Sequence, residues 1–234
     1  TCRPMGTSVE FASNGGKAAG YLALPESGSG PGVIVVQEWW GLDSGIREMT
    51  DRLAAEGFVA LAPDLYHGQL AGHTEMDRAG ELMAAMPVDR AARDMSGAVD
   101  YLVGLDATTG SGVGVMGFCM GGMLTFFLAA DRPDRVKAAV PFYGYPQGDG
   151  QPDYSKITAT IQGHMAENDD FFGPEGARAL ERQLRDLGKD VTLTVHAGAG
   201  HAFMAPHNAL GTLDEELAAR VWPQAVAFLH EHLD

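Results

Sequence analysis

A cysteine framed by glycines is the feature that most constrains how this chain can fold. Residues 113–122 read V-G-V-M-G-F-C-M-G-G, an apolar run that ends at Cys119 with Gly117 and Gly121 two residues to either side. The spacing is that of G-x-S-x-G with sulfur in place of oxygen, in which the nucleophile occupies a strained turn between a strand and a helix. Only glycines let the neighbouring backbone pass so close. We therefore predict a strand, then this cysteine, then a helix, with the thiol placed to attack a carbonyl carbon.

Apolar runs typical of buried strands alternate with segments of helical spacing through the rest of the chain. Near the N-terminus, residues 8–24 alternate apolar and polar around Asn14-Gly15-Gly16, which predicts a hairpin of two antiparallel strands. Strands that alternate with helices predict a doubly wound, mostly parallel sheet, and we expect one α/β domain over residues 1–234. The predicted strands are 33–37, 58–63, 112–116, 136–143, 159–163 and 191–195, and the predicted helices are 46–54, 76–86, 89–105, 120–130, 174–187 and 212–233.

The negative charge of the chain argues against nucleic acids and anionic membranes as partners. With 16 Lys and Arg against 31 Asp and Glu, the formal net charge is −15, and the basic residues form no cluster. A protein that binds nucleic acid or an anionic membrane needs a basic face, so we exclude both and expect a small-molecule substrate. No apolar run approaches ~20 residues and the first residues lack the apolar core of a signal peptide, which predicts no membrane span and a cytoplasmic location.

The cysteines and histidines argue against a disulfide framework and a metal site. Pairing Cys2 with Cys119 would disable the best candidate nucleophile, so a free thiol and a reducing compartment are expected. We predict neither a metal nor another cofactor, and a monomer or small homo-oligomer. The histidines without ligand-like spacing to one another are His67, His73, His164, His196 and His207.

Polar residues that follow three predicted strands form the candidate catalytic set, because ligands bind at the carboxyl ends of parallel strands. They are Cys119, Asp169 and His201, in the chain order nucleophile, acid, histidine. A thiol is mostly protonated at neutral pH, so it needs His201 as a base and the N-terminus of the following helix as a positive field. Asp169 would hold the imidazole in the correct tautomer. Asp170 is the second candidate for the acid.

Each of these residues also has an interpretation without chemistry. A lone cysteine is most often a small buried hydrophobe, a histidine in a glycine-rich loop can be a surface residue, and an aspartate ahead of Pro174 can be a solvated loop residue or a helix cap. The glycine frame around Cys119 favours chemistry. The oxyanion that forms as sulfur attacks needs two preorganised donors, which we predict to be the backbone N–H groups of Met120 and Trp39.

Six motifs resemble those of the dienelactone hydrolases, in order along nearly the whole chain. They are Q-E-W-W-G at 37–41, A-P-D-L-Y at 62–66, G-F-C-M-G-G at 117–122, F-Y-G at 142–144, E-N-D at 167–169 and G-H-A-F at 200–203. The resemblance implies an α/β-hydrolase fold, a triad of Cys119, Asp169 and His201, and opening of enol lactones such as 4-carboxymethylenebut-2-en-4-olide to maleylacetate. It also implies that Glu38 contacts the resting thiol and helps to deprotonate it when substrate arrives.

The chain departs from this family at its substrate-binding arginines. Family members that act on the carboxylated dienelactone hold its carboxylate with two arginines, one of them a few residues after the histidine, where this chain reads H-A-F-M-A-P from His201. We therefore expect an uncharged lactone or small ester, with a general carboxylesterase as the alternative. A redox-sensing or binding protein that uses Cys119 without turnover is the alternative of another class. The predicted substrate contacts are Arg78, Tyr143, Trp40, Phe171 and Phe203.

Overall fold

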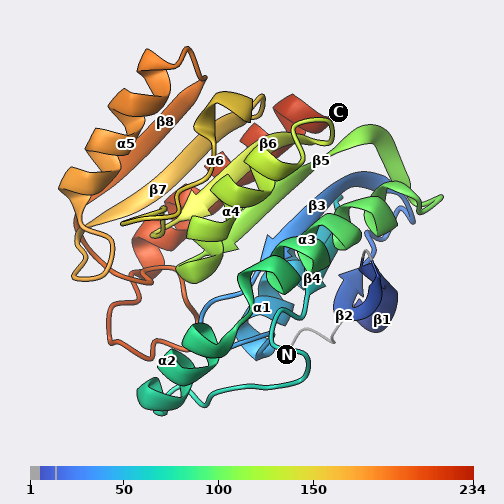
Figure 1. Cartoon of the computed structure of the whole chain (residues 1–234), viewed down its shortest axis with the longest axis horizontal. Helices are drawn as coiled ribbons and strands as arrows, with labels where there is room; N and C mark the ends of the chain where they lie inside the picture. Colours follow the sequence, from blue (N-terminus) through green and yellow to red (C-terminus); the bar gives the residue numbers. More distant parts are fainter. Residues whose placement is uncertain (1–5, 14) are drawn as a thin grey trace.

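The computed structural model describes residues 6–13 and 15–234, so the predictions that involve Cys2 and Asn14 lie outside the described residues. Within them, eight strands form one sheet in the order β1-β2-β4-β3-β5-β6-β7-β8 (Figure 1). β1 (Gly6–Ser13) and β2 (Gly16–Ala23) pair antiparallel, and β2 is also antiparallel to β4 (Val59–Pro63). All other neighbouring pairs in this sheet are parallel. The N-terminal hairpin and the mostly parallel sheet are confirmed.

The predicted catalytic residues follow β3 and β5, in the middle of the sheet, and β7 and β8, at the edge away from the N-terminal hairpin. β3 (Gly30–Val36) is buried at every residue and lies between β4 and β5 (Thr108–Phe118), which explains its continuous apolar run. β5 and the last two strands of the chain, β7 and β8, extend beyond their predicted ends. Pairing with neighbouring strands continues them through glycines and polar residues that the sequence pattern assigns to loops. The remaining strands are β6 (Val136–Phe142), β7 (Thr160–Asn168) and β8 (Val191–Gly200).

Helices cover both faces of the sheet, as a doubly wound fold requires. Val33 and Val35 belong to one buried cluster and Ile34 and Val36 to the other, and alternate residues of a strand face opposite sides. Figure 1 shows α3 and α4 on the near face and α6 behind the sheet. The first cluster packs against α1 (Ser44–Ala55) and α6 (Glu215–Leu233), and the second against α2 (Met76–Ala85), α3 (Val88–Val103), α4 (Met120–Asp131) and α5 (Pro174–Asp186). One short 3-10 helix, Tyr154–Lys156, is absent from the sequence prediction.

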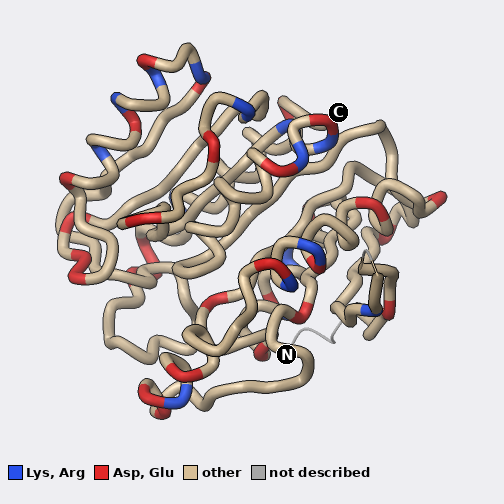
Figure 2. Tube along the Cα trace, in the orientation of Figure 1, with Lys and Arg blue, Asp and Glu red and all other residues tan. Residues whose placement is uncertain are grey.

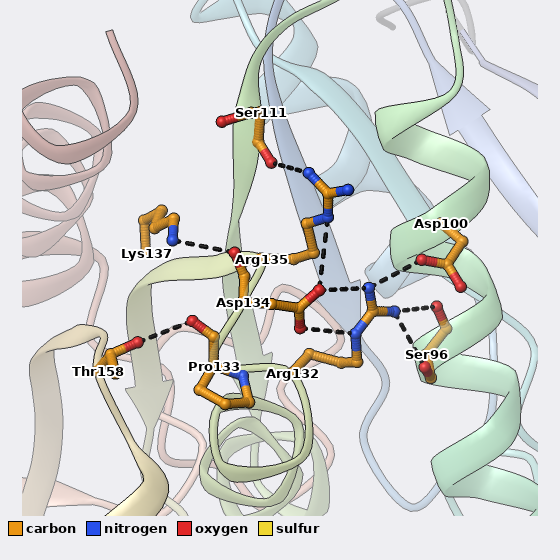
Figure 3. A network of polar contacts seen from close by, with 9 residues as sticks. All are labelled: Ser96, Asp100, Ser111, Arg132, Pro133, Asp134, Arg135, Lys137 and Thr158. Carbon is orange, nitrogen blue, oxygen red and sulfur yellow. Dashed lines mark hydrogen bonds and ion pairs between the residues drawn. The ribbon is translucent and has the colours of Figure 1, made fainter.

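A network of polar contacts fixes the amino end of β6, where the preceding helix α4 ends (Figure 3). Arg132 donates to Asp134 at 3.0 Å and pairs with Asp100 on α3 at 2.8 Å. Arg135 donates to the carbonyl oxygen of Ser111 at 2.8 Å. This network lies at the amino ends of the parallel strands. The carboxyl ends of β3, β5, β7 and β8 lie at the opposite end of the sheet, and the candidate site is found there.

The charges are spread over the helices and loops. Figure 2 shows Lys and Arg interspersed with Asp and Glu, for example along α5, and this view presents no basic face. In the part of the chain that the structure describes, no helix combines the length and the apolar character needed to cross a bilayer.

Candidate active site

Cys119 occupies a strained turn between β5 and α4. Its φ of 56° and ψ of −117° lie where L-residues are rarely found. A β-carbon on Gly117 would lie 2.1 Å from the carbonyl oxygen of Gly121, and one on Gly121 would lie 2.2 Å from the carbonyl oxygen of Val36. The two glycines therefore let the turn pack against itself and against β3. The order strand, cysteine, helix predicted from their spacing is confirmed.

Asp169 and His201 form a buried pair at the ends of β7 and β8. Oδ2 of Asp169 lies 2.7 Å from Nδ1 of His201, and their side chains are 0% and 7% exposed. Oδ1 of Asp169 accepts hydrogen bonds from the backbone N–H groups of Phe171 and Phe172, each at 2.8 Å. Because the carboxylate is fixed in this way, it favours the His201 tautomer that carries its proton on Nδ1 and keeps a lone pair on Nε2. Asp170, the second candidate for the acid, is exposed.

The surroundings of Cys119 keep its thiol protonated at rest. Burial raises the pKa of the thiol above its usual range, and the charges of Glu38 and Asp169 raise it further. The backbone N–H groups of Met120 and Trp39 act in the opposite sense and lower this pKa, because they hydrogen-bond to the sulfur and favour the thiolate. The two donors predicted for the oxyanion therefore converge on the reacting atom.

A second pair of carboxylate and imidazole lies beside the first. Oε2 of Glu38 is 2.7 Å from Nε2 of His207, and both side chains are 6% exposed. The ring of His207 stacks on that of His73 with centroids 4.1 Å apart, and Nε2 of His73 lies 2.6 Å from Oδ2 of Asp43. Sequence reasoning considers His207 and His73 only as histidines without metal-ligand spacing and misses this arrangement. The signal that could reveal it is the carboxylate of Glu38, which needs a donor if it is buried.

These groups surround a cavity of about 460 Å³. Seven of its fifteen lining residues are tryptophan, methionine or phenylalanine, and no Lys or Arg is among the described residues that line it. The same part of the chain holds no group of three or more His, Cys, Asp or Glu placed to bind a metal ion. The polar residues of the wall are Glu38, Cys119, Gln147, His201 and His207.

Comparison with known proteins establishes the family. Residues 18–233 match the Dienelactone hydrolase family. This chain belongs to that family. It is 40% identical to "Protein usf" of Aquifex pyrophilus over 98% of this chain and 100% of that protein, and 38% identical to a putative carboxymethylenebutenolidase of Aquifex aeolicus over the same shares. The crystal structure of a putative dienelactone hydrolase from Klebsiella pneumoniae superposes with a TM-score of 0.82 at 27% identity, covering 97% of this chain and 99% of that one.

As a member of the dienelactone hydrolase family, the protein is a hydrolase that acts on lactone or ester bonds. The resemblance seen in the six motifs and the α/β-hydrolase fold that it implies are both confirmed.

Four aromatic residues predicted to contact the substrate of this hydrolase divide into two groups. Trp40 and Phe171 line the cavity. Tyr143 and Phe203 are buried and are absent from its wall, and the ring of Tyr143 packs edge-on against His201 with centroids 5.3 Å apart. Both residues belong to motifs, but a motif does not reveal which way each of its side chains points. The structure therefore places Tyr143 and Phe203 in the core behind the site, where Tyr143 packs against His201 and Phe203 packs against Tyr143.

The structure does not bring Arg78 to the cavity. The residue lies on α2, donates to Oε1 of Gln69 at 2.8 Å, and pairs with Glu81 at 3.5 Å on the exposed side of that helix. None of the six motifs lies on α2, so the resemblance to the family identifies no single arginine there. The cationic group expected from the family is thus missing at both positions.

Proposed function

We propose that Cys119, Asp169 and His201 act as a catalytic triad that hydrolyses an uncharged lactone or small ester through an acyl-thioester intermediate. One observation carries this proposal. The thiol on the strained turn, the Asp169–His201 pair and two backbone N–H groups that face the sulfur all meet at one cavity. These are the nucleophile, the oriented base and the oxyanion donors that acyl transfer requires.

In the first half-reaction, Glu38 takes the thiol proton as substrate enters, and the sulfur of Cys119 attacks the carbonyl carbon. The carbonyl oxygen becomes negative and accepts hydrogen bonds from the N–H groups of Met120 and Trp39. The carbon–oxygen bond of the ester then breaks, and the leaving oxygen takes the proton from Glu38. The acyl group remains on the sulfur as a thioester.

In the second half-reaction, water attacks the thioester. His201 accepts a proton of that water at Nε2 while its Nδ1–H stays on Asp169, which stabilises the imidazolium. The tetrahedral intermediate collapses and releases the carboxylic acid, and the sulfur of Cys119 takes the proton back from the imidazolium. The enzyme returns to its starting state.

The wall of the cavity supports an uncharged substrate. It offers no Lys or Arg to pair with a carboxylate, whereas Glu38 contributes a negative charge that repels one. The same wall favours a general carboxylesterase as the second candidate. The ratio of kcat/KM for simple esters to that for the carboxylated dienelactone measures this preference, and a ratio below one would contradict it. Cys119 is a free thiol and must stay reduced to react, which supports a cytoplasmic location.

Alkylation of Cys119 tests the triad. A Cys2→Ser background leaves one thiol in the chain, which has two cysteines. Hydrolysis of p-nitrophenyl acetate should fall in proportion to the fraction of Cys119 that iodoacetamide has modified, as measured by mass spectrometry. Hydrolysis that survives complete modification would refute the thioester mechanism.

A further inference from the structure

We propose that His207 is the positioning residue for Glu38, which it holds ionised and in place beside the thiol of Cys119. The inference rests on the proposed function, because it concerns the group that takes the thiol proton there. It is carried by the contacts of one imidazole ring, and these contacts fix both the proton on that ring and the charge of its partner.

The protonation state of His207 follows from its two ring nitrogens. The backbone N–H of Ala209 donates to Nδ1 at 3.0 Å, so Nδ1 carries no proton. The single proton of the neutral ring is then on Nε2, which lies 2.7 Å from Oε2 of Glu38 and donates to it. His207 therefore acts as a neutral donor to an ionised carboxylate.

The groups packed around His207 hold the ring in this orientation. His73 stacks on it with centroids 4.1 Å apart. Burial lowers the pKa of His207, but the hydrogen bond and charge of Glu38 and the charge of Asp43 outweigh burial and raise it. A second proton would have to bind at Nδ1, where the N–H of Ala209 already donates, so protonation would break that contact.

Glu38 depends on such a donor. The residue is 4% exposed, and among the described side chains only His207 donates to its carboxylate. A carboxylate buried without a donor takes up a proton, because burial favours the neutral form. A protonated Glu38 could not accept the proton of Cys119, and it would no longer raise the pKa of the thiol. Loss of the His207 contact should therefore slow ester turnover and make the free thiol more reactive.

Two substitutions separate positioning of Glu38 from packing of the loop. The amide nitrogen of His207→Gln can lie near the position of Nε2, so it keeps the donor to Glu38 and loses the acceptor for Ala209. The amide oxygen of His207→Asn can lie near the position of Nδ1, so it keeps the acceptor for Ala209 and does not reach Glu38. A structural role predicts that the Asn variant works and the Gln variant fails. A positioning role predicts the reverse.

The experiment measures kcat/KM with p-nitrophenyl acetate and the rate of Cys119 alkylation by iodoacetamide at fixed pH, both in the full chain with Cys2→Ser. We expect His207→Asn to lose about tenfold or more in kcat/KM, the lower range of what general acid–base groups contribute, while its alkylation rate rises. His207→Gln should stay closer to the wild type in both. Equal turnover of the Asn variant and the wild type, a larger defect in the Gln variant, or a parallel fall of turnover and alkylation would each overturn the proposal.

His67→Asn is the matched control. His67 also pairs with a buried carboxylate, that of Asp94 at 2.7 Å, but it does not line the cavity, and asparagine tolerates its φ of 52°. Its turnover and alkylation rate should equal those of the wild type. If the wild type hydrolyses no ester, the proposed function fails by itself. The alkylation rates of the Asn and Gln variants then still decide whether His207 keeps Glu38 charged.

Discussion

Replacing Asp169 with asparagine should move one proton on His201 and leave the backbone around it unchanged. Oδ1 of Asp169 accepts two backbone N–H groups at 2.8 Å, and Oδ2 faces Nδ1 of His201 at 2.7 Å. Asparagine can keep its oxygen on the two N–H groups and present its NH2 group to Nδ1. The imidazole must then accept at Nδ1 and carry its proton on Nε2, where the proposed reaction needs a lone pair.

The two half-reactions should respond differently to this substitution. With its proton on Nε2, His201 cannot take a proton from water, and the corresponding tautomer change in a serine triad costs about 10⁴-fold in kcat. We expect a loss on the order of 10³-fold to 10⁴-fold here for the same reason. Acylation uses Glu38 and continues, so p-nitrophenyl acetate should give a burst of one p-nitrophenol per enzyme followed by slow turnover.

Folding should hardly be affected by Asp169→Asn. The variant makes as many hydrogen bonds at this position as the wild type, so the free energy of unfolding should change by no more than about 1 kcal/mol. Asp169→Ala leaves the N–H groups of Phe171 and Phe172 without their acceptor and should cost about 1–3 kcal/mol. Urea denaturation compares the two variants and separates the chemical role of the carboxylate from its structural role.

Stopped-flow absorbance resolves the burst, and mass spectrometry of the intact protein detects the acetyl group on Cys119. Asp170→Asn, at the exposed neighbouring position, is the control and should behave as the wild type. A steady-state rate for Asp169→Asn within about tenfold of the wild type would refute Asp169 as the group that sets the tautomer. Loss of the burst in a folded protein would show that His201, and not Glu38, deprotonates the thiol.

Two further substitutions test the surroundings of the thiol and the turn that carries it. Glu38→Gln removes a charge that raises the pKa of Cys119, so alkylation by iodoacetamide should follow a titration at lower pH, whereas ester turnover should fall about 10²-fold or more. A rise in both rates would exclude Glu38 as the base. Gly121→Ala places Cβ 2.2 Å from the carbonyl oxygen of Val36 and should cost about 3 kcal/mol or more in urea unfolding. Gly80→Ala on α2, where a Cβ meets nothing within 4 Å, should instead stabilise by about 0.5–1 kcal/mol, and equal stability of the two variants would contradict the packing of the turn.

The features that the sequence predicts well are those whose cause is local. Gly117 and Gly121 lie within four residues of each other, so the turn at Cys119 can be read from spacing alone. The alternation of apolar runs likewise predicts the order of strands and helices. The lengths of β5, β7 and β8 cannot be predicted from local sequence. Pairing with a strand far along the chain decides whether a polar residue or a glycine continues each of these strands.

The contacts that the sequence misses join residues far apart. Glu38 and His207 are 169 positions apart, and no local pattern shows that the loop after β8 returns to the loop after β3. Tyr143 belongs to the F-Y-G motif and still points into the core, since side-chain direction depends on the packed sheet. Arg78 belongs to a segment without a motif, so nothing local shows that it faces away from the cavity.

The turn that follows Asp169 couples the shape of the cavity to the surroundings of His201. The oxygen that is not used on His201 folds the turn that carries Phe171 and Phe172, and both rings form part of the cavity wall. Both rings also pack against His201, with centroids 4.9 and 5.8 Å away, so changes to these two side chains would disturb the proposed base as well as the shape of the cavity. Met83 on α2 lines the same cavity, and no described contact joins its side chain to Asp169 or His201. New specificities should therefore accumulate on α2, where a mutation reshapes the pocket without altering the proton transfers.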